Sequence, residues 1–106
     1  MGMSTQPIVF ALNDENLKRM IREAARDTAR VFFTPHAKKR MKQRRITPTQ
    51  VYDCLKNGSV CEPGHVNIHG NWQCALTRRH AGDEITVAAA LERDDKGNWV
   101  TVITVY

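Results

Sequence analysis

A histidine and two arginines, spaced four positions apart, are the first candidates for chemistry in this chain. On a helix, where each residue turns by about 100°, His36, Arg40 and Arg44 would form one stripe. Histidine can transfer a proton near neutral pH, and arginine can hold a phosphate bidentately without losing its charge. The stripe therefore predicts a phosphate-binding edge, and a solvated helix surface is the alternative.

A second candidate group lies at the basic end of the predicted strand Trp72–His80 and at the end of the chain. Strand alternation puts Arg78 and His80 on one face and Arg79 on the other, and Tyr106 is a conceivable proton donor. Cleavage of RNA without a metal needs a base for the 2′-hydroxyl, cations for the phosphorane and an acid for the leaving 5′-oxygen. These residue types could supply all three. The alternative is that the two arginines pair with carboxylates of the same chain.

Charge distribution favours a polyanionic partner. The net charge is +5, and no carboxylate occurs between Asp27 and Asp53. The rest of the chain holds fewer basic than acidic residues, so the whole excess comes from one stretch. Its basic residues are Arg30, Lys38, Lys39, Arg40, Lys42, Arg44 and Arg45. This pattern predicts contact with RNA, DNA or an acidic protein, and a solvated basic face is the alternative.

The stripe must be positioned by two helices with a very short joint. Thr34 can cap the first helix, and Pro35 suits its first position, where a missing N–H costs nothing. Thr47 and Pro48 repeat this arrangement, and Gln50 completes a capping box. We therefore expect one helix from Thr34 to about residue 46 and another from residue 48 to about residue 56.

An earlier helix is predicted from about residue 14 to residue 30, with Asn13 or Asp14 as its cap. After the last helix, Gly58 is expected to supply a left-handed cap. Beyond it the apolar period changes to two, which indicates strands. The strands predicted there are 59–62 and 65–69 around a Pro63-Gly64 turn, then 72–80, 84–92 and 99–106, and residues 31–33 are predicted as a brief strand before Pro35.

These elements predict one domain, residues 1–106, of the α+β class, with N-terminal helices packed on one face of a C-terminal antiparallel sheet. No apolar run is long enough to span a bilayer, and residues 1–7 do not resemble a signal peptide. Cys54, Cys61 and Cys74 are expected to be reduced core residues of a cytoplasmic protein.

Metal and cofactor sites have little support in the sequence. His65 and His69 have the spacing of helical zinc ligands but lie in a β-like stretch without an obvious third ligand. The chain has neither a glycine-rich phosphate loop nor a serine nucleophile elbow. We therefore expect no metal and no small-molecule cofactor.

The run H-A-K-K-R-M-K-Q-R-R-I-T-P-T-Q-V, the later L-K-N-G and the final V-I-T-V-Y resemble a family of small, mostly uncharacterised bacterial domains. That family has the pattern H-A-x-x-R-M-x-x-R-x-I-s-x-x-x-V, a helix ending in N-G and a late V-I-T-V-Y strand. It is similar to the BrnT and MqsR toxins and to the RelE-like ribonuclease superfold. The resemblance covers about Phe33 to Tyr106, which leaves residues 1–30 as an added helix before a core of residues 31–106.

The resemblance implies a toxin of a type II toxin–antitoxin system, an mRNA endonuclease inhibited by a cognate antitoxin protein. The positions that match the family pattern are His36, Arg40, Arg44, Arg78 or Arg79, and Tyr106.

The leading hypothesis is thus a metal-independent endoribonuclease that uses attack by the 2′-hydroxyl of RNA. Its candidate catalytic residues are His36, Arg40, Arg44, Arg78, His80 and Tyr106, and its candidate RNA-binding residues are Lys38, Lys39, Lys42, Arg45 and Arg79. One alternative is a non-catalytic nucleic-acid-binding module, in which the two joined helices act as a helix-turn-helix. Another is a protein-interaction domain whose basic helix docks an acidic partner.

Overall fold

The structure is a computed structural model that describes residues 13–80 and 82–106, apart from the side chain of His80. Three α-helices, one 3₁₀ helix and five strands are present in these residues. They are α2 (Asp14–Ala25), η1 (Thr28–Arg30), β1 (Val31–Phe33), α3 (Pro35–Arg44), α4 (Pro48–Asn57), β2 (Ser59–Val66), β3 (Trp72–His80), β4 (Asp83–Asp94) and β5 (Gly97–Val105). The N-terminal residues discussed above as lacking a signal peptide lie outside the described part.

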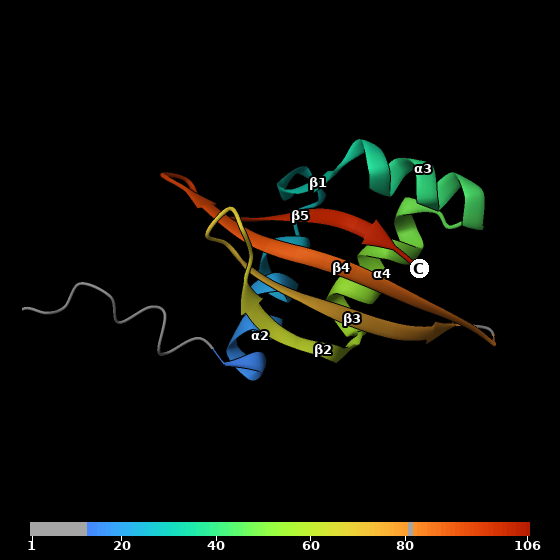
Figure 1. Ribbon diagram of the computed structural model, residues 1–106, viewed down its shortest axis with the longest axis horizontal. Helices are drawn as coiled ribbons and strands as arrows, with labels where there is room; N and C mark the ends of the chain where they lie inside the picture. The colour runs from blue at the N-terminus through green and yellow to red at the C-terminus, as the bar shows by residue number, and fades with distance from the viewer. Residues whose placement is uncertain (1–12, 81) are drawn as a thin grey trace, which may run out of the picture.

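The strands form one sheet in the order β1-β5-β4-β3-β2 (Figure 1). The α+β class is confirmed, with helices packed on a sheet. The sheet is mixed rather than purely antiparallel, because β1 runs parallel to β5 with Val31 opposite Val100. The main chain continues this pairing into the next turn, where the Thr34 N–H donates to the Val102 carbonyl at 3.1 Å. β1 thereby holds the start of α3 against β5.

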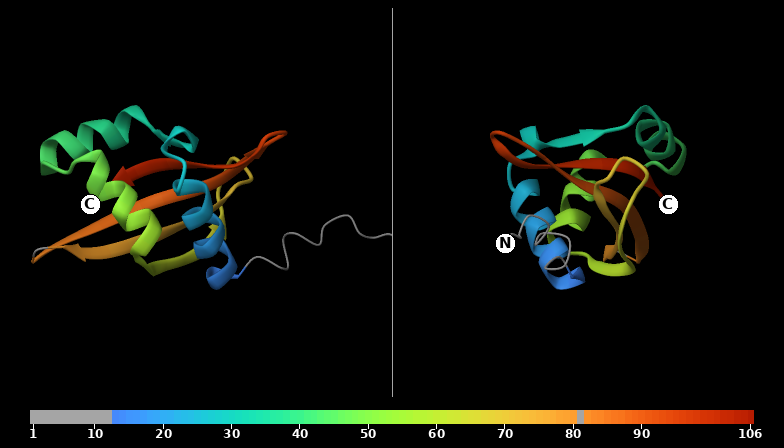
Figure 2. Two further views of the ribbon diagram at one scale, coloured as in Figure 1. Left: turned by 180° about the vertical axis from the view of Figure 1, so that it is seen from behind. Right: turned by 60° about the vertical axis from the view of Figure 1, so that its left-hand side comes forward.

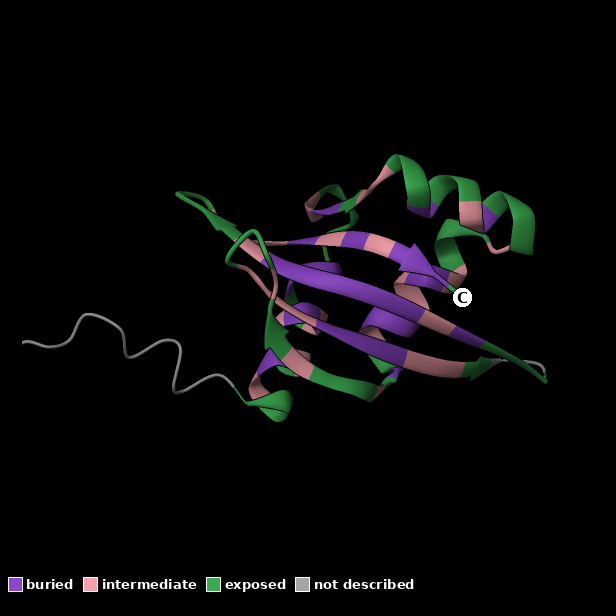
Figure 3. Cartoon of the chain, in the orientation of Figure 1, coloured by how far each residue is buried: buried purple, intermediate pink, exposed green. Residues whose placement is uncertain are grey.

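Helices α2 and α4 cover one face of the sheet, whereas α3 lies beside the β1–β5 edge (Figures 1 and 2). The core lies between the sheet and these two helices, with Val51 and Leu55 of α4 packed in one cluster with Leu76, Val87 and Val102. None of the described helices covers the other face of the sheet, although β4 is buried over most of its length (Figure 3). That face is called the open face below.

Local capping signals gave correct helix starts. The Thr34 hydroxyl accepts from the Ala37 N–H at 3.0 Å, and Pro35 opens α3. At α4 the capping box is complete, since the Thr47 hydroxyl accepts from the Gln50 N–H and the Gln50 side chain accepts from the Thr47 N–H. Each such cap stabilises its helix by about 1 kcal/mol. The basic helix α3 and the following helix α4 therefore begin where the sequence predicts.

Two predicted boundaries were wrong. The first helix ends at Ala25 rather than near residue 30, and a separate 3₁₀ turn follows. The predicted Pro63-Gly64 hairpin does not form, because β2 is one continuous strand whose register shifts twice along β3. These irregularities accommodate the proline within the strand, and the chain reverses instead at residues 67–71.

The glycine after α4 has a different role from the predicted one. Gly58 is extended, with φ −73° and ψ 169°, so it does not supply a left-handed cap. A Cβ at this position would lie 2.5 Å from the Cys54 carbonyl oxygen and 2.9 Å from that of Thr77. Glycine is therefore needed for close approach between the end of α4 and β3. The left-handed residue is Arg45, with φ 57°, directly after α3.

The cysteines also differ from the prediction in one case. Cys54 and Cys74 are buried core residues, as expected, but Cys61 on β2 is exposed. None of the described helices has the length and hydrophobicity that a bilayer crossing requires.

Candidate nucleic-acid interface

A groove separates the end of the basic helix α3 from the beginning of β4. Arg44 and Arg45, at the end of α3, line a groove of about 330 Å³ together with residues 82–85 of the β3–β4 turn and β4. The left-handed backbone of Arg45 reverses the chain there, so both arginines stay at this end of the sheet. Both are exposed, and neither guanidinium has a hydrogen bond or ion pair with any described residue. Their guanidiniums are therefore available to an anion.

The groove also contains acidic groups. Asp83 and Glu84 line it opposite the arginines. Both carboxylates are exposed and at least partly screened by water. These carboxylates limit where a phosphate can bind in the groove, because they repel it. A phosphate must therefore lie nearer the arginines than the β3–β4 turn.

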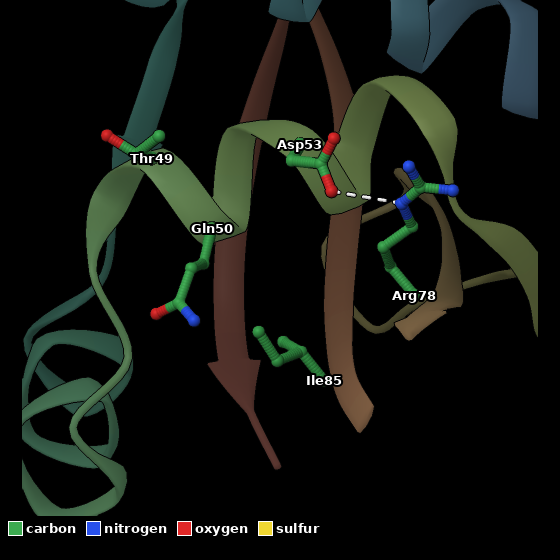
Figure 4. Close-up of a pocket in the computed structure, with 5 residues that line it drawn as sticks. All are labelled: Thr49, Gln50, Asp53, Arg78 and Ile85. Atoms are coloured by element: carbon green, nitrogen blue, oxygen red, sulfur yellow. Dashed lines mark hydrogen bonds and ion pairs between the residues drawn. The ribbon is translucent and has the colours of Figure 1, made fainter. Parts of the chain in front are cut away.

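Arg78 points toward the helices and is engaged with α4 (Figure 4). Its Nε donates to Oδ2 of Asp53 at 3.0 Å, and both side chains are partly exposed, at 40% and 32%. This ion pair is the outcome that the sequence left open as the alternative to phosphate binding. The pair borders a small hollow of about 60 Å³, lined also by Gln50 and Ile85. Those two residues line the larger groove as well, so the two depressions adjoin.

Arg79 lies on the opposite face of β3, where it is exposed and stands opposite Glu84 of β4. Tyr106 shares this open face. Its N–H donates to the Thr86 carbonyl at 2.8 Å, and Thr86 stands opposite Thr77 of β3. Because directly opposed residues point to the same side of a sheet, Tyr106, Thr86 and Thr77 form one row. The predicted strand alternation thus separates Arg78 from Arg79 and leaves only Arg79 near the tyrosine.

The three residues of the stripe on α3, His36, Arg40 and Arg44, have different surroundings. Ala37 and Met41 are buried in the core, and Arg40 beside them is half-buried. The Nε of Arg40 donates to the Val105 carbonyl at 3.3 Å, so Arg40 ties α3 to the end of β5, next to Tyr106. His36 is exposed and lines neither the groove of Arg44 and Arg45 nor the hollow of Arg78.

The lysines predicted to contact RNA all lie on the solvent side of α3. Lys38, Lys39 and Lys42 are exposed, and none of them has an ion pair with a described residue. Because α3 contains no carboxylate, their charge is not compensated within the helix. Together with Arg44 and Arg45, they extend the basic surface along α3.

Other chemistry has less support from the described residues. The side chain of His80 lies outside them, so only its backbone position opposite Asp83 is placed. No group of three or more histidine, cysteine, aspartate or glutamate residues in the described part is arranged to hold a metal ion. Burial raises the pKa of both Cys54 and Cys74 to about 12, so these thiols stay protonated at neutral pH and are poor nucleophiles.

The sequence did not reveal the contribution of α4 to this region. The sequence predicted Gln50 only as a capping residue, and it did not specify which carboxylate would pair with an arginine. Gln50 and Asp53 both line the hollow beside Arg78. A signal existed in their spacing, since residues 49, 50 and 53 share one side of a helix, but that pattern does not specify which strand they face.

A family model described as "Domain of unknown function (DUF4258)" matches residues 33–106. The chain belongs to this family, since the match covers more than half of its length. Comparison with curated proteins and with solved structures found no match. The family boundary falls at β1, so α2 precedes the family domain, yet α2 packs into the same core.

Proposed function

We propose that this protein is a metal-independent endoribonuclease of the toxin type, which cleaves mRNA by attack of the 2′-hydroxyl on the adjacent phosphate. One observation carries the proposal. Four candidate residues surround the first residues of β4: Arg44 and Arg45, at the end of α3, approach from the helix side, whereas Arg79 of β3 and the terminal Tyr106 lie on the open face. The guanidiniums of these three arginines have no hydrogen bond or ion pair with any described residue, so they can neutralise a phosphate and its developing charge.

The geometry favours distinct roles for the candidate residues. Arg44, Arg45 and Arg79 bind phosphate groups, and Tyr106 acts beside them as a proton donor or a hydrogen-bond donor. Arg40 and Arg78 position the site, because each is already bonded to protein atoms, Arg40 to Val105 and Arg78 to Asp53. His36 and His80 remain the candidates for proton transfer. His36 would reach a neighbouring nucleotide from the start of α3.

The same proposal includes a partner and a compartment. A toxin of this type acts in the cytoplasm and is held inactive by a cognate antitoxin protein. An acidic segment of the antitoxin could cover the exposed lysines and arginines of α3, which have no partners among the described residues.

A second candidate function is a non-catalytic nucleic-acid-binding module. It is favoured by one observation, namely that His36 lies outside the groove that holds Arg44 and Arg45. The lysines and arginines would then contact phosphates without any proton transfer.

The decisive experiment is controlled expression followed by mapping of RNA ends. The proposal expects growth arrest and new 5′ ends in cellular RNA, and expects the purified protein to cleave RNA in the presence of EDTA. His36→Ala and Tyr106→Phe should each abolish or strongly reduce cleavage while leaving RNA affinity near the wild-type value. Normal growth and intact RNA, together with tight RNA binding, would support the binding module instead.

A salt titration tests the binding surface independently of cleavage. Replacing Lys38, Lys39 and Lys42 with glutamine should flatten the slope of log affinity against log salt by about two to three units, at somewhat under one unit per phosphate contact. The matched control replaces Lys18, Lys56 and Lys96, which removes the same charge away from α3. An equal loss in both triple variants would show that net charge alone matters and would move the interface elsewhere.

A further inference from the structure

The largest of the described depressions lies at the far end of the open face from the arginines. It has a volume of about 740 Å³, and its floor is Ala90 at the centre of the sheet. Ala90 stands between Gln73 of β3 and Thr101 of β5, whose longer side chains rise on either side. The loop of residues 67–71 arches over this part of the face (Figures 1 and 2). This hollow is called the face groove.

The polar side chains of the face groove are held in fixed orientations. Asn67 accepts through Oδ1 from the N–H groups of His69 and Asn71, at 2.9 and 3.1 Å. Its Nδ2 then donates to Oε1 of Gln73 at 3.0 Å. The carbonyl end of Gln73 is thereby occupied, and its Nε2 has no partner among the described residues. The loop thus leaves Gln73 with donor capacity in the groove.

A carboxylate stands on the other side of the floor. Glu92 accepts from the Thr101 hydroxyl through Oε2, and its Oε1 has no hydrogen bond with a described residue. A carboxylate can accept about four hydrogen bonds, so Glu92 retains most of its capacity. Among the residues that the structure describes, it is the only carboxylate that lines the groove. The groove therefore presents an acceptor pair and a separate donor, above a flat apolar floor.

The face groove has apolar walls, and one of them includes an isoleucine whose exposure to water is unfavourable. Ile68 is 95% exposed, although the loop that carries it is held by the Asn67 hydrogen bonds. Ile68 and Ile103 both line the groove. An ordered loop that keeps an isoleucine in water is consistent with a planar ligand packing against it.

We infer that the face groove binds a guanine base of single-stranded RNA. The Watson–Crick edge of guanine presents two adjacent donors, N1–H and the 2-amino group, beside the acceptor O6. Glu92 can accept from both donors while Gln73 donates to O6. Adenine, cytosine and uracil each lack that pair of adjacent donors. Base edges read in this way are typical of single-stranded RNA, whose bases can leave the stack and pack on side chains.

The inference rests on the proposed function, and continuity of the open face links the two sites. Tyr106 pairs with Thr86, and Glu92 lies six residues further along the same face of β4. At about 3.3 Å per residue this is roughly 20 Å, so the base bound in the groove is separated from the arginines by more than one nucleotide. A single strand laid along the open face would join them. The groove would then select where along an RNA the arginine end acts.

The test measures binding of short 2′-O-methyl oligouridines, which cannot undergo attack by a 2′-hydroxyl, with one central guanosine, inosine or adenosine. Wild-type protein should bind the guanosine oligomer about tenfold more tightly than the adenosine oligomer, as expected for a bidentate base contact. Inosine, which lacks the 2-amino group, should bind with intermediate affinity. Glu92→Gln should remove this discrimination, since an amide cannot accept from both donors.

Matched variants separate the groove from general effects. Glu62→Gln, on β2, makes the same charge change outside the groove and should keep the preference for guanosine. Ala90→Leu raises the floor from the open face and should also remove the preference, while leaving the salt dependence of binding unchanged. Circular dichroism of each variant checks that the fold is intact, and a disrupted Ala90→Leu leaves Glu92→Gln as the deciding variant.

The possible failures are distinguishable. Tight, salt-dependent binding without any base preference would overturn this inference and leave the proposed function standing. Absence of RNA binding would overturn both. A preference for guanosine that survives both Glu92→Gln and Ala90→Leu would place base recognition outside the face groove and leave the groove to another occupant, such as a protein.

Discussion

Arginines at the two ends of β4 are in opposite states. At the end of β4, Arg30 donates to Oδ1 of Asp94 at 3.1 Å and to the carbonyls of Gly97 and Asn98 at 3.0 and 3.2 Å. At its beginning, Arg44 and Arg45 lie in a groove with no such bond to any described residue. At one end of β4, an arginine therefore joins η1 to the β4–β5 turn. At the other end, two arginines remain available to bind an anion.

The comparison corrects one part of the charge argument. Arg30 was counted with the basic stretch that ends at Arg45, but its charge is already used within the fold. A guanidinium with three protein partners must lose those bonds before it can bind phosphate, whereas an exposed one loses only water. The basic surface that can meet RNA thus begins with the lysines of α3.

The largest effect is expected from the arginines without partners. A variant with Arg44→Gln and Arg45→Asn should lose growth arrest and RNA cleavage, and the slope of log affinity against log salt should fall by about two units. Asparagine is chosen at position 45 because it tolerates the left-handed backbone there. Affinity can be measured by fluorescence anisotropy over a salt series. A variant with the wild-type slope would exclude these two residues from the interface.

Arg30→Gln should have the reverse signature. Losing the hydrogen bonds to the Gly97 and Asn98 carbonyls should lower the free energy of unfolding by about 1–2 kcal/mol, with the partial exposure of Arg30 taken into account. Urea denaturation measures this change. RNA affinity should stay within about twofold of wild type once the protein is folded, because the Arg30 guanidinium is already bonded to protein atoms. A fully stable variant with weakened RNA binding would contradict the distinction between the two ends.

Thr47→Ala tests whether the arginine end depends on its helix cap. The Thr47 hydroxyl caps α4, and the Gln50 side chain accepts from the Thr47 N–H in return. Gln50 also lines both depressions at this end of the sheet. The expected cost is about 1 kcal/mol of stability, measured as a shift of the urea midpoint. RNA cleavage should persist below the melting temperature. Wild-type melting combined with lost cleavage would place the hydroxyl in the site instead.

The smallest effect concerns pH at the Arg30 end. The Lys96 N–H and then Arg30 hold the pKa of Asp94 below its usual value of 3.8. A lowered folded-state pKa stabilises the protein above pH 3.8, and this contribution is lost as the pH falls through the folded value. Arg30→Gln should therefore move the Asp94 carboxyl titration, followed by ¹³C NMR, toward 3.8. An unmoved titration would show that the backbone donor alone sets the pKa.

Local signals in the sequence were sufficient for the helix starts and for most strand faces. A cap depends on a side chain and an N–H about three residues apart, as at Thr34 and Thr47, so the information lies within one turn. Strand alternation depends only on the next residue, and it correctly put Arg78 and Arg79 on different faces. Breaks in a strand are less visible, and Pro63-Gly64 suggested a turn that the paired strand β3 overrides.

The sequence identified the residues of the candidate site, but it could not show which of them are bonded within the protein and which remain available to a ligand. Residue types, net charge and spacing identified His36, Arg40, Arg44, Arg78, Arg79 and Tyr106 as candidates. Which of them are free follows from long-range contacts, such as Arg78 with Asp53 and Arg40 with the Val105 carbonyl. These contacts join residues far apart in the chain. The Arg40 contact follows from the parallel pairing of β1 with β5, which holds α3 beside β5, and the Arg78 contact follows from the packing of α4 on the sheet. A hydrogen bond between distant residues depends on that packing, so the identity of the unpaired arginines is a property of the folded protein.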